Sequence, residues 1–189
     1  MQTTTPRRPQ GFTLIEMMMA LAALAILVSL AAPAFGSLIE STEAATSRNA
    51  LRTALATART FAAGKSAHVV VCPSADQQYC GRTTQWQHGW IIFIDADRDA
   101  QRSPDEDLLG ASQALPEGVA IVSTAGRTRV NYRPDGSATG SNVTFTICDK
   151  RGADAATTLV INNAGRVRPG KPSPAAAASC VSVLDAPRA

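Results

Sequence analysis

The feature that most constrains this chain is an apolar run near its N-terminus, which extends from Phe12 to Phe35 and carries one formal charge, Glu16. As a helix rising about 1.5 Å per residue, the run would be about 36 Å long, enough to cross the hydrocarbon core of a bilayer. Arg7 and Arg8 precede the run. Because positive charge favours the cytoplasmic side of a membrane, we expect a transmembrane segment with a cytoplasmic N-terminus and an exported remainder.

A secretory signal peptide is the alternative interpretation of this run, since Ala32-Pro33-Ala34 has the small residues of a cleavage site. Glu16 argues against that alternative. A carboxylate at the centre of a membrane helix costs about 2.5–3.5 kcal/mol on insertion scales, and such a charge indicates a function with a partner group. We therefore expect another group to compensate the charge of Glu16.

The residues around Glu16 resemble the N-terminus of type IV pilins and pseudopilins, since Gly11-Phe12-Thr13-Leu14-Ile15-Glu16 precedes an apolar helix. The resemblance implies that residues 1–11 are a leader, that a prepilin peptidase cleaves after Gly11, and that Phe12 is N-methylated. It also implies that Glu16 neutralises the terminal amine of a neighbouring subunit, and a buried carboxylate is tolerable only when paired. The implied partners are other pilins or pseudopilins, membrane lipid before assembly, and an inner-membrane assembly platform.

The helical pattern continues over residues 36–63, where small and apolar residues recur largely at spacings of three, four and seven: Leu38, Leu51, Leu55, Ala58 and Ala62. This spacing predicts an amphipathic helix whose Ala-rich side packs on a sheet and which ends near Gly64. Pro33 lacks a backbone N–H, so we expect a local bend at that residue.

Residues 64–189 change to a strand-like pattern and predict a β-rich globular domain. Short β-branched or aromatic runs are separated by turn signals, and they comprise Ala67–Cys72, Trp90–Ile94, Val119–Val122, Arg127–Arg133, Val143–Cys148 and Thr157–Ile161. The pattern predicts antiparallel strands, with Trp86, Trp90 and Phe93 in the core. A Pro/Ala-rich connector over Pro169–Ser179 precedes a final apolar run, Cys180–Leu184.

The order of motifs in the domain resembles that of FimT/GspH-type minor pilins: Cys72-Pro73-Ser74, Gly89-Trp90-Ile91-Ile92-Phe93-Ile94-Asp95, Arg133-Pro134-Asp135-Gly136 and Gly165-Arg166-Val167-Arg168. The resemblance implies an α+β pilin fold, in which one long N-terminal helix packs on a C-terminal antiparallel sheet domain. It also implies a subunit of type IV pili or of the type II secretion pseudopilus. We therefore expect an inner-membrane protein with a periplasmic domain that later enters a filament.

The four cysteines of this exported domain should be oxidised. Three pairings are possible, and we expect the local one, Cys72 with Cys80 and Cys148 with Cys180. A zinc site is the alternative, but these spacings contain no C-x-x-C pair. The second bridge would hold the C-terminal segment against the sheet.

Charge is distributed unevenly along the chain. Residues 64–125 contain four basic and eight acidic side chains, whereas residues 126–189 contain nine basic and four acidic ones. A basic end favours a polyanionic partner, although surface charge also serves solubility alone.

Arg166-Val167-Arg168 follows the turn at Asn163-Ala164-Gly165. In an extended segment, alternation would place both guanidinium groups on one face. Lys171 lies just beyond, and the same alternation would bring three more cations to one face: Arg127, Arg129 and Arg133. Arginine forks match phosphate oxygens, so this region predicts salt-sensitive, sequence-independent binding of double-stranded DNA.

The resemblance to FimT-type minor pilins points to the same place, because their Gly-Arg-x-Arg turn is associated with binding of transforming DNA. Gly165, Arg166 and Arg168 match that turn residue by residue. The alternatives are that the arginines protect a sheet edge in solvent, or that they pair with Asp149 or Asp154. The alternative function is a type II secretion pseudopilin, for which the arginine pair would be incidental.

The acidic segment from Asp95 to Glu106 reproduces positions 1, 3, 5 and 12 of a calcium loop with Asp95, Asp97, Asp99 and Glu106. Ala100 stands where such loops need glycine, and Pro104, Arg98 and Arg102 also oppose cation binding. We expect a solvated turn without a metal.

The sequence offers no constellation for catalysis. His68 and His88 have no recognisable nucleophile or metal partner nearby in the sequence. We therefore expect a binding and assembly protein that has no cofactor.

Overall fold

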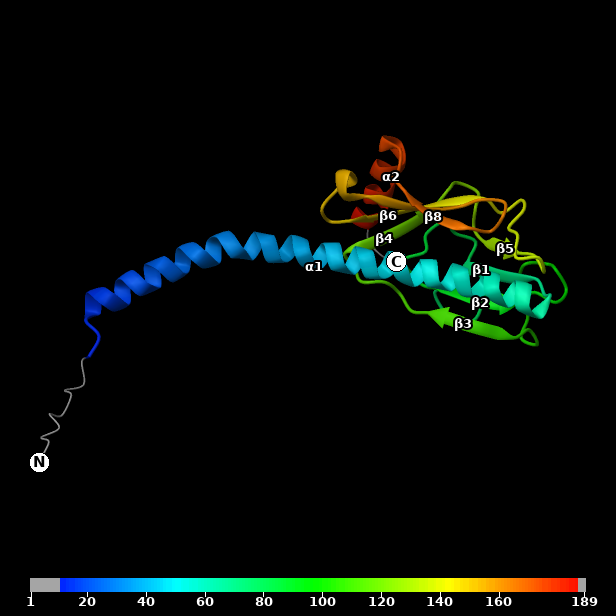
Figure 1. The fold of residues 1–189 in the computed structure, drawn as a ribbon, viewed down its shortest axis with the longest axis horizontal. Helices are drawn as coiled ribbons and strands as arrows, with labels where there is room; N and C mark the ends of the chain where they lie inside the picture. Colours follow the sequence, from blue (N-terminus) through cyan, green and yellow to red (C-terminus); the bar gives the residue numbers. More distant parts are fainter. Residues whose placement is uncertain (1–10, 187–189) are drawn as a thin grey trace, which may run out of the picture. The chain divides into compact units, whose positions relative to one another are not determined.

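The computed structural model describes residues 11–186, and of residues 30–34 it describes only the backbone. The chain divides into two compact units, residues 1–38 and residues 39–189. Figure 1 shows the fold, whose elements in chain order are α1 (Leu14–Lys65), β1 (Val69–Pro73), β2 (Trp90–Ile94), β3 (Leu108–Ser112), β4 (Val119–Ser123), β5 (Val130–Tyr132), β6 (Val143–Asp149), η1 (Ala153–Ala155), β7 (Thr157–Ile161), β8 (Val167–Gly170) and α2 (Pro174–Asp185).

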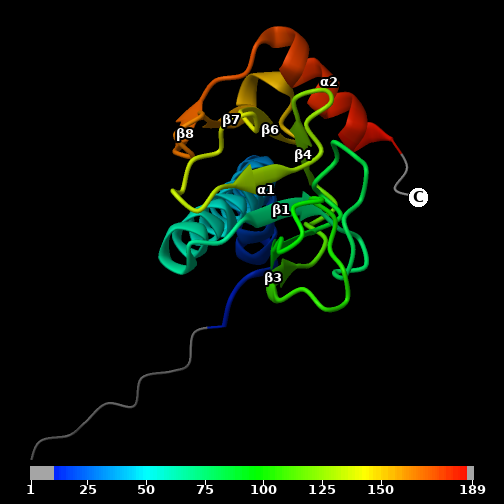
Figure 2. The same cartoon turned by 90° about the vertical axis from the view of Figure 1, so that its right-hand side faces the viewer.

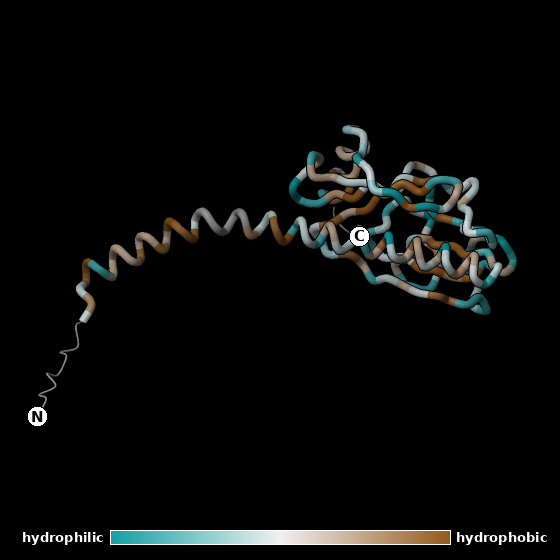
Figure 3. Tube along the Cα trace, viewed as in Figure 1, coloured by the Kyte–Doolittle hydropathy of each residue, from teal (hydrophilic) through white to brown (hydrophobic). Residues whose placement is uncertain are grey.

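Helix α1 confirms the predicted long helix to within two residues at its C-terminal end, and its backbone is helical across Pro33. Figure 3 shows apolar residues along its N-terminal part, where the side chains from Phe12 to Ser29 are all exposed. Within the part of the chain that the structure describes, no helix combines the length and mean hydropathy of a membrane span. Residues 1–10 of the predicted leader lie outside the described residues, and the bend at Pro33 stays a prediction.

The first sheet has the strand order β3-β2-β1-β5, and all its pairs are antiparallel. Strand β1 is buried on both faces: Val69 and Val71 enter the main core, whereas Val70 and Cys72 enter a second apolar cluster with Phe93. Burial on both sides explains why β1 and β2 are nearly continuous apolar runs without polar alternation.

The second sheet has the antiparallel order β4-β6-β7-β8. Its inner face meets the same core as the first sheet and the buried side of α1, which includes Leu51 and Leu55. Trp86 packs edge-on against Phe145 with ring centroids 4.8 Å apart, and its Nε1 donates to Ser123 Oγ at 3.2 Å. Trp86, Trp90 and Phe93 are at most 2% exposed, which confirms their predicted place in the core.

Helix α2 lies over the outer face of the second sheet (Figure 2), where Ala177 and Cys180 form a small apolar cluster with Ala120 and Cys148. Both expected disulfides are present, with Cα atoms 5.5 Å apart in Cys72–Cys80 and 6.0 Å apart in Cys148–Cys180. The zinc alternative is wrong because these bridges occupy all four cysteine sulfur atoms.

Three parts of the domain differ from the sequence analysis. Strand β3 was not predicted, because its sequence, LLGAS, contains no β-branched residue. Residues 169–179 are not a plain connector, since β8 extends to Gly170 and α2 begins at Pro174 with Ser173 as its cap. The predicted strand over residues 127–133 shrinks to Val130–Tyr132. The α+β class itself is confirmed.

Candidate functional site

The turn before β8 is fixed by its own hydrogen bonds. The N–H of Gly165 donates to Asn162 O at 2.8 Å, and the N–H of Arg166 donates to Asn162 Oδ1 at 3.0 Å. Gly165 has φ +74°, and a Cβ at this position would collide with the carbonyl oxygen of Gly136. Glycine is therefore required here both for its left-handed backbone and for the close approach of a second turn.

The strand that follows the turn separates one apolar residue from two cations. Val167 lies opposite Ile161 of β7 and packs against the main core. Arg168 lies opposite Val160, whose side chain is exposed, so Arg168 belongs to the outer face of the sheet. Arg166 and Arg168 are both exposed, and Arg166 lies just before the first residue of β8.

Arg166 lines a depression of about 330 Å³ together with Arg52 and Arg59 of α1. Neither helix arginine is part of the predicted site. They stand seven residues apart on α1, which is the only signal in the sequence that they share a helix face. Their contact with a turn more than 100 residues later in the chain is a product of the tertiary fold.

The other predicted cations lie in different places. Lys171 lines a groove of about 470 Å³ between α2 and the outer face of the second sheet. Arg127 donates to Gly140 O at 2.8 Å, and Arg129 donates to Ala100 O. Arg133 lines a separate depression that also includes Asp95. The expected gathering of Arg127, Arg129 and Arg133 on one strand face is wrong, since β5 begins only at Val130.

Ion pairing does not account for the exposed arginines near the turn. Among residues 11–186 one salt bridge is present, in which Arg151 meets Asp149 at 2.7 Å. Two hydrogen bonds from the guanidinium to both carboxylate oxygens make this pair bidentate, and they raise the pKa of Arg151. Asp149 is therefore already paired within its own turn.

The acidic loop gathers its carboxylates closely. Oxygen atoms of Asp95, Asp97 and Asp99 lie within 4.8 Å of one another. Burial and the neighbouring negative charges raise the pKa of Asp95, although the N–H of Ala100 donates to it at 3.3 Å. Ala100 has φ +59°, the conformation for which such loops favour glycine. The solvated, metal-free state of this loop stays a prediction.

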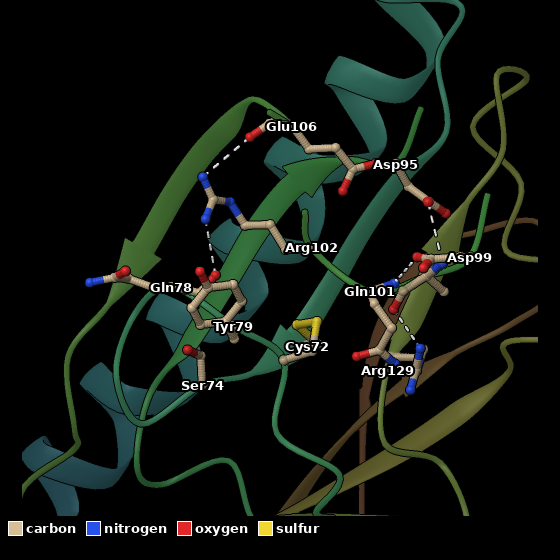
Figure 4. Close-up of a disulfide and its surroundings, with 12 residues drawn as sticks. Cys72, Ser74, Gln78, Tyr79, Asp95, Asp99, Gln101, Arg102, Glu106 and Arg129 are labelled. Atoms are coloured by element: carbon tan, nitrogen blue, oxygen red, sulfur yellow. Dashed lines mark hydrogen bonds between the residues drawn. A yellow bond between two sulfur atoms is a disulfide. The ribbon is translucent and has the colours of Figure 1, made fainter. Parts of the chain in front are cut away.

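The side chains of Glu106 and Arg102 make hydrogen bonds to backbone groups of the acidic loop (Figure 4). Glu106 is 7% exposed and accepts hydrogen bonds from Ala96 N at 2.8 Å and Ser103 N at 2.9 Å. Arg102 donates to Gln78 O and to Glu106 O, both at 3.2 Å. These contacts tie the acidic loop to the loop of the Cys72–Cys80 disulfide.

At the N-terminal end of α1, Gly11, Phe12 and Glu16 are exposed. The N–H of Glu16 donates to Thr13 Oγ1 at 3.3 Å, so Thr13 caps the first turn of the helix. The roles expected for these residues in cleavage, methylation and assembly stay predictions.

Two family models match the chain. The model described as type II transport protein GspH matches residues 47–165, and the prokaryotic N-terminal methylation motif matches residues 6–32. The GspH match ends at Gly165, so Arg166, Arg168 and Lys171 lie beyond it. A search of curated proteins finds no match.

Solved structures share the fold at low identity. The type IV minor pilin FimU of Pseudomonas aeruginosa PAO1 has 21% identity and a TM-score of 0.54, with 73% of this chain and 92% of FimU covered. A second crystal form of FimU has 18% identity and a TM-score of 0.51, with 71% of this chain and 93% of FimU covered. The minor pseudopilin EpsH of the Vibrio cholerae type 2 secretion system has 16% identity and a TM-score of 0.48, with 69% of this chain and 98% of EpsH covered.

The likeness to FimU agrees with the long helix on an antiparallel sheet domain. The GspH model alone covers more than half of the chain. The chain therefore belongs to the GspH family of minor pilins and pseudopilins.

Proposed function

We propose that this chain is a minor type IV pilin whose basic turn, Gly165-Arg166-Val167-Arg168, binds double-stranded DNA during natural transformation. The observation that carries the proposal is a pair of exposed arginines on a turn fixed by hydrogen bonds, with neither arginine paired to a carboxylate among the described residues. A fixed turn reduces the entropy that the arginines lose when they grip a ligand.

The chemistry of the turn suits the phosphate backbone. Guanidinium groups donate in pairs to phosphate oxygens, and such contacts carry no base information. One module of this kind binds with a Kd of order 10⁻⁴–10⁻⁶ M. Several subunits or several turns of DNA would raise the effective affinity through multivalency.

The assembly part of the proposal rests on the N-terminal methylation motif at residues 6–32. A prepilin peptidase cleaves after Gly11, Phe12 is methylated, and Glu16 pairs with the terminal amine of a neighbouring pilin. Before assembly, the exposed apolar side chains of Phe12 to Ser29 lie in the inner membrane, with the N-terminus cytoplasmic and the domain periplasmic. The inner-membrane platform then adds the subunit to the filament.

The DNA-binding proposal is tested with the full chain in a nonionic detergent and a labelled duplex, by fluorescence anisotropy at low salt. The double variant Arg166→Gln/Arg168→Gln should lose measurable binding. Arg48→Gln/Arg82→Gln removes the same charge from other parts of the domain and should bind within about twofold of wild type. Equal binding by wild type and the turn variant would refute the proposal.

A type II secretion pseudopilin is the second candidate, and the GspH family match favours it. Deletion of the gene separates the two functions when transformation, twitching and exoprotein release are measured in parallel. A transformation defect with normal exoprotein release supports the pilin. The reverse result supports the pseudopilin.

A further inference from the structure

We propose that the depression between α1 and the turn before β8 binds a single phosphate group, held jointly by Arg52, Arg59 and Arg166. This inference deepens the proposed DNA binding and rests on it for the biological ligand. It adds a helix to the interface and assigns two arginines that lie outside the Gly-Arg-x-Arg pattern.

The three arginines come together because of how α1 packs. Leu55 and Ala58 are fully buried and face the core, which turns the neighbouring stripe of Arg52, Ala56 and Arg59 toward one side of the helix. Ala56 stands between the two arginines and has the smallest side chain that a good helix former offers. The short side chain of Ala56 therefore leaves room in the depression that Arg52 and Arg59 also line.

The turn supplies the opposite wall, and contacts with α1 fix its distance from the helix. The Nε of Arg59 donates to Gly136 O at 3.0 Å, and the same carbonyl is the one that a Cβ on residue 165 would strike. Arg59, Gly136 and Gly165 thus meet at one point. Since Arg166 follows directly, its position relative to Arg59 is set by packed backbone and not by a free loop.

Charge in the depression is unbalanced. Its lining contains three cations and, among the described residues, no carboxylate. The hydroxyl of Thr60, at its edge, donates to Ala56 O at 3.0 Å and so is used within the helix. Three guanidinium groups around one hollow repel each other, and a bound anion removes that repulsion.

A buried tyrosine packs close to Gly165, in the turn that forms one wall of the depression. Tyr132 is fully buried, its hydroxyl has no hydrogen-bond partner among the described residues, and a Cβ on Gly165 would lie 3.1 Å from its Cε1. Burial raises the pKa of the Tyr132 hydroxyl, and the nearby charge of Arg59 opposes that shift.

The lining also limits the ligand class to the phosphate itself. The depression has no aromatic ring on which a base could stack, and no amide side chain that could read a base edge, among the described residues. The site should therefore accept a phosphodiester of any sequence, in double or single strands.

The first test uses Arg52→Gln, because Arg52 is exposed and lines the depression without a hydrogen bond that the fold needs. We expect about tenfold weaker binding of duplex and of single-stranded DNA. For the duplex, the negative slope of log K against log salt concentration should become smaller in magnitude by about 0.9, the value of one lost phosphate contact. Arg48→Gln, on the same helix but outside the depression, is the matched control and should change neither quantity.

A double-mutant cycle between Arg52→Gln and Arg166→Gln sharpens the test. If one phosphate bridges the two arginines, the double variant binds appreciably better than the product of the two single losses predicts. Additive losses would mean separate contacts and would overturn the joint site. Arg59→Lys keeps the charge but not the Nε contact with Gly136, so it should weaken binding less than Arg59→Gln.

The second test needs no DNA. Inorganic pyrophosphate is titrated into the full chain in detergent while amide and arginine Nε resonances are followed by NMR. Saturable shifts at Gly165, Arg166 and Arg59, absent in Arg52→Gln, support the site, and flat titrations refute it.

The two proposals fail in different ways. If Arg166→Gln/Arg168→Gln abolishes DNA binding but Arg52→Gln behaves as Arg48→Gln, the joint site is wrong and the DNA-binding turn stands. If wild type binds pyrophosphate in the depression but no DNA, the proposed function is wrong and the phosphate site stands.

Discussion

The acidic loop from Asp95 to Glu106 and the basic turn before β8 are both rich in charge, yet they use it in opposite ways. In the acidic loop, carboxylates accept backbone N–H groups, and Arg102 and Arg129 donate to backbone carbonyls. Near the basic turn, Arg52 and Arg166 line a depression without any carboxylate among the described residues.

The difference indicates which charges serve the fold and which are left for a ligand. A charge that satisfies buried backbone groups is costly to remove, whereas an exposed, unpaired charge contributes little to stability. Substitutions in the acidic loop should therefore change the free energy of unfolding, and substitutions in the basic depression should change binding.

The largest effect that sharpens this contrast is expected from the backbone under the basic turn. Gly165→Ala must adopt φ +74° and push against the carbonyl of Gly136, so we expect about 2–4 kcal/mol of destabilisation. Gly126→Ala is the control, because Gly126 has φ +76° but nothing within 4 Å of its added Cβ, and it should cost about 1 kcal/mol. Urea unfolding measures both. Equal losses would show that the approach to Gly136 does not matter.

The next effect belongs to the acidic loop. Glu106→Gln replaces one acceptor oxygen of a buried carboxylate with an NH₂ group that faces the N–H of Ala96 or Ser103. We expect about 2 kcal/mol of destabilisation with DNA binding unchanged. Asp105→Asn changes an exposed neighbour and should leave the urea midpoint within error. A loss of DNA binding in Glu106→Gln would break the division between the two loops.

A smaller effect is a pH dependence that originates at Asp95, whose pKa is raised by burial and by the neighbouring carboxylates. The Asp95 carboxyl therefore keeps its proton to a higher pH in the folded state than in the unfolded state. As the pH rises above the ordinary aspartate pKa of about 3.9, ionisation of Asp95 lowers the free energy of unfolding. Asp95→Asn keeps the acceptor for Ala100 and should remove this decline. The test measures the free energy of unfolding of wild type and Asp95→Asn between about pH 4 and pH 7. The same pH dependence in the two proteins would contradict the prediction.

The smallest effect on stability is expected at the arginines themselves. Arg166→Gln/Arg168→Gln should shift the free energy of unfolding by no more than about 0.5 kcal/mol, because both side chains are exposed and unpaired. Thermal unfolding followed by circular dichroism is the measurement. A drop of 2 kcal/mol or so would place these arginines with the structural charges of the acidic loop.

Much of the fold follows from local patterns in the sequence. The buried stripe of α1, with Leu51 and Leu55, and five of the six predicted strands lie close to where spacing places them. Strand β8 escapes prediction because Pro169 is tolerated only at a sheet edge, and an edge is defined by the neighbours of the strand. Helix α2 escapes because its Pro/Ala-rich start resembles a linker until the Cys148–Cys180 bridge places it on the sheet.

The candidate site is predicted only in part, for the same reason. Gly165, Arg166 and Arg168 are visible as a motif, because a glycine turn and its flanking arginines are local in sequence. The approach of Arg52 and Arg59 depends on how the helix packs against a distant turn, which no local spacing encodes. Alternation also places Arg127 wrongly, since the strand is too short to include it.

The Cys148–Cys180 bridge encloses the basic turn in a covalent ring, since its two cysteines are separated by 32 residues in sequence. A pull on DNA held at Arg166 therefore reaches Cys148 along two covalent paths, one through β7 and one through Cys180. Part of the force reaches strand β6 through the disulfide, and the backbone hydrogen bonds between β6 and β4 resist it together. Reduction of this bridge should therefore weaken the subunit more against unfolding under a pulling force than against unfolding without load.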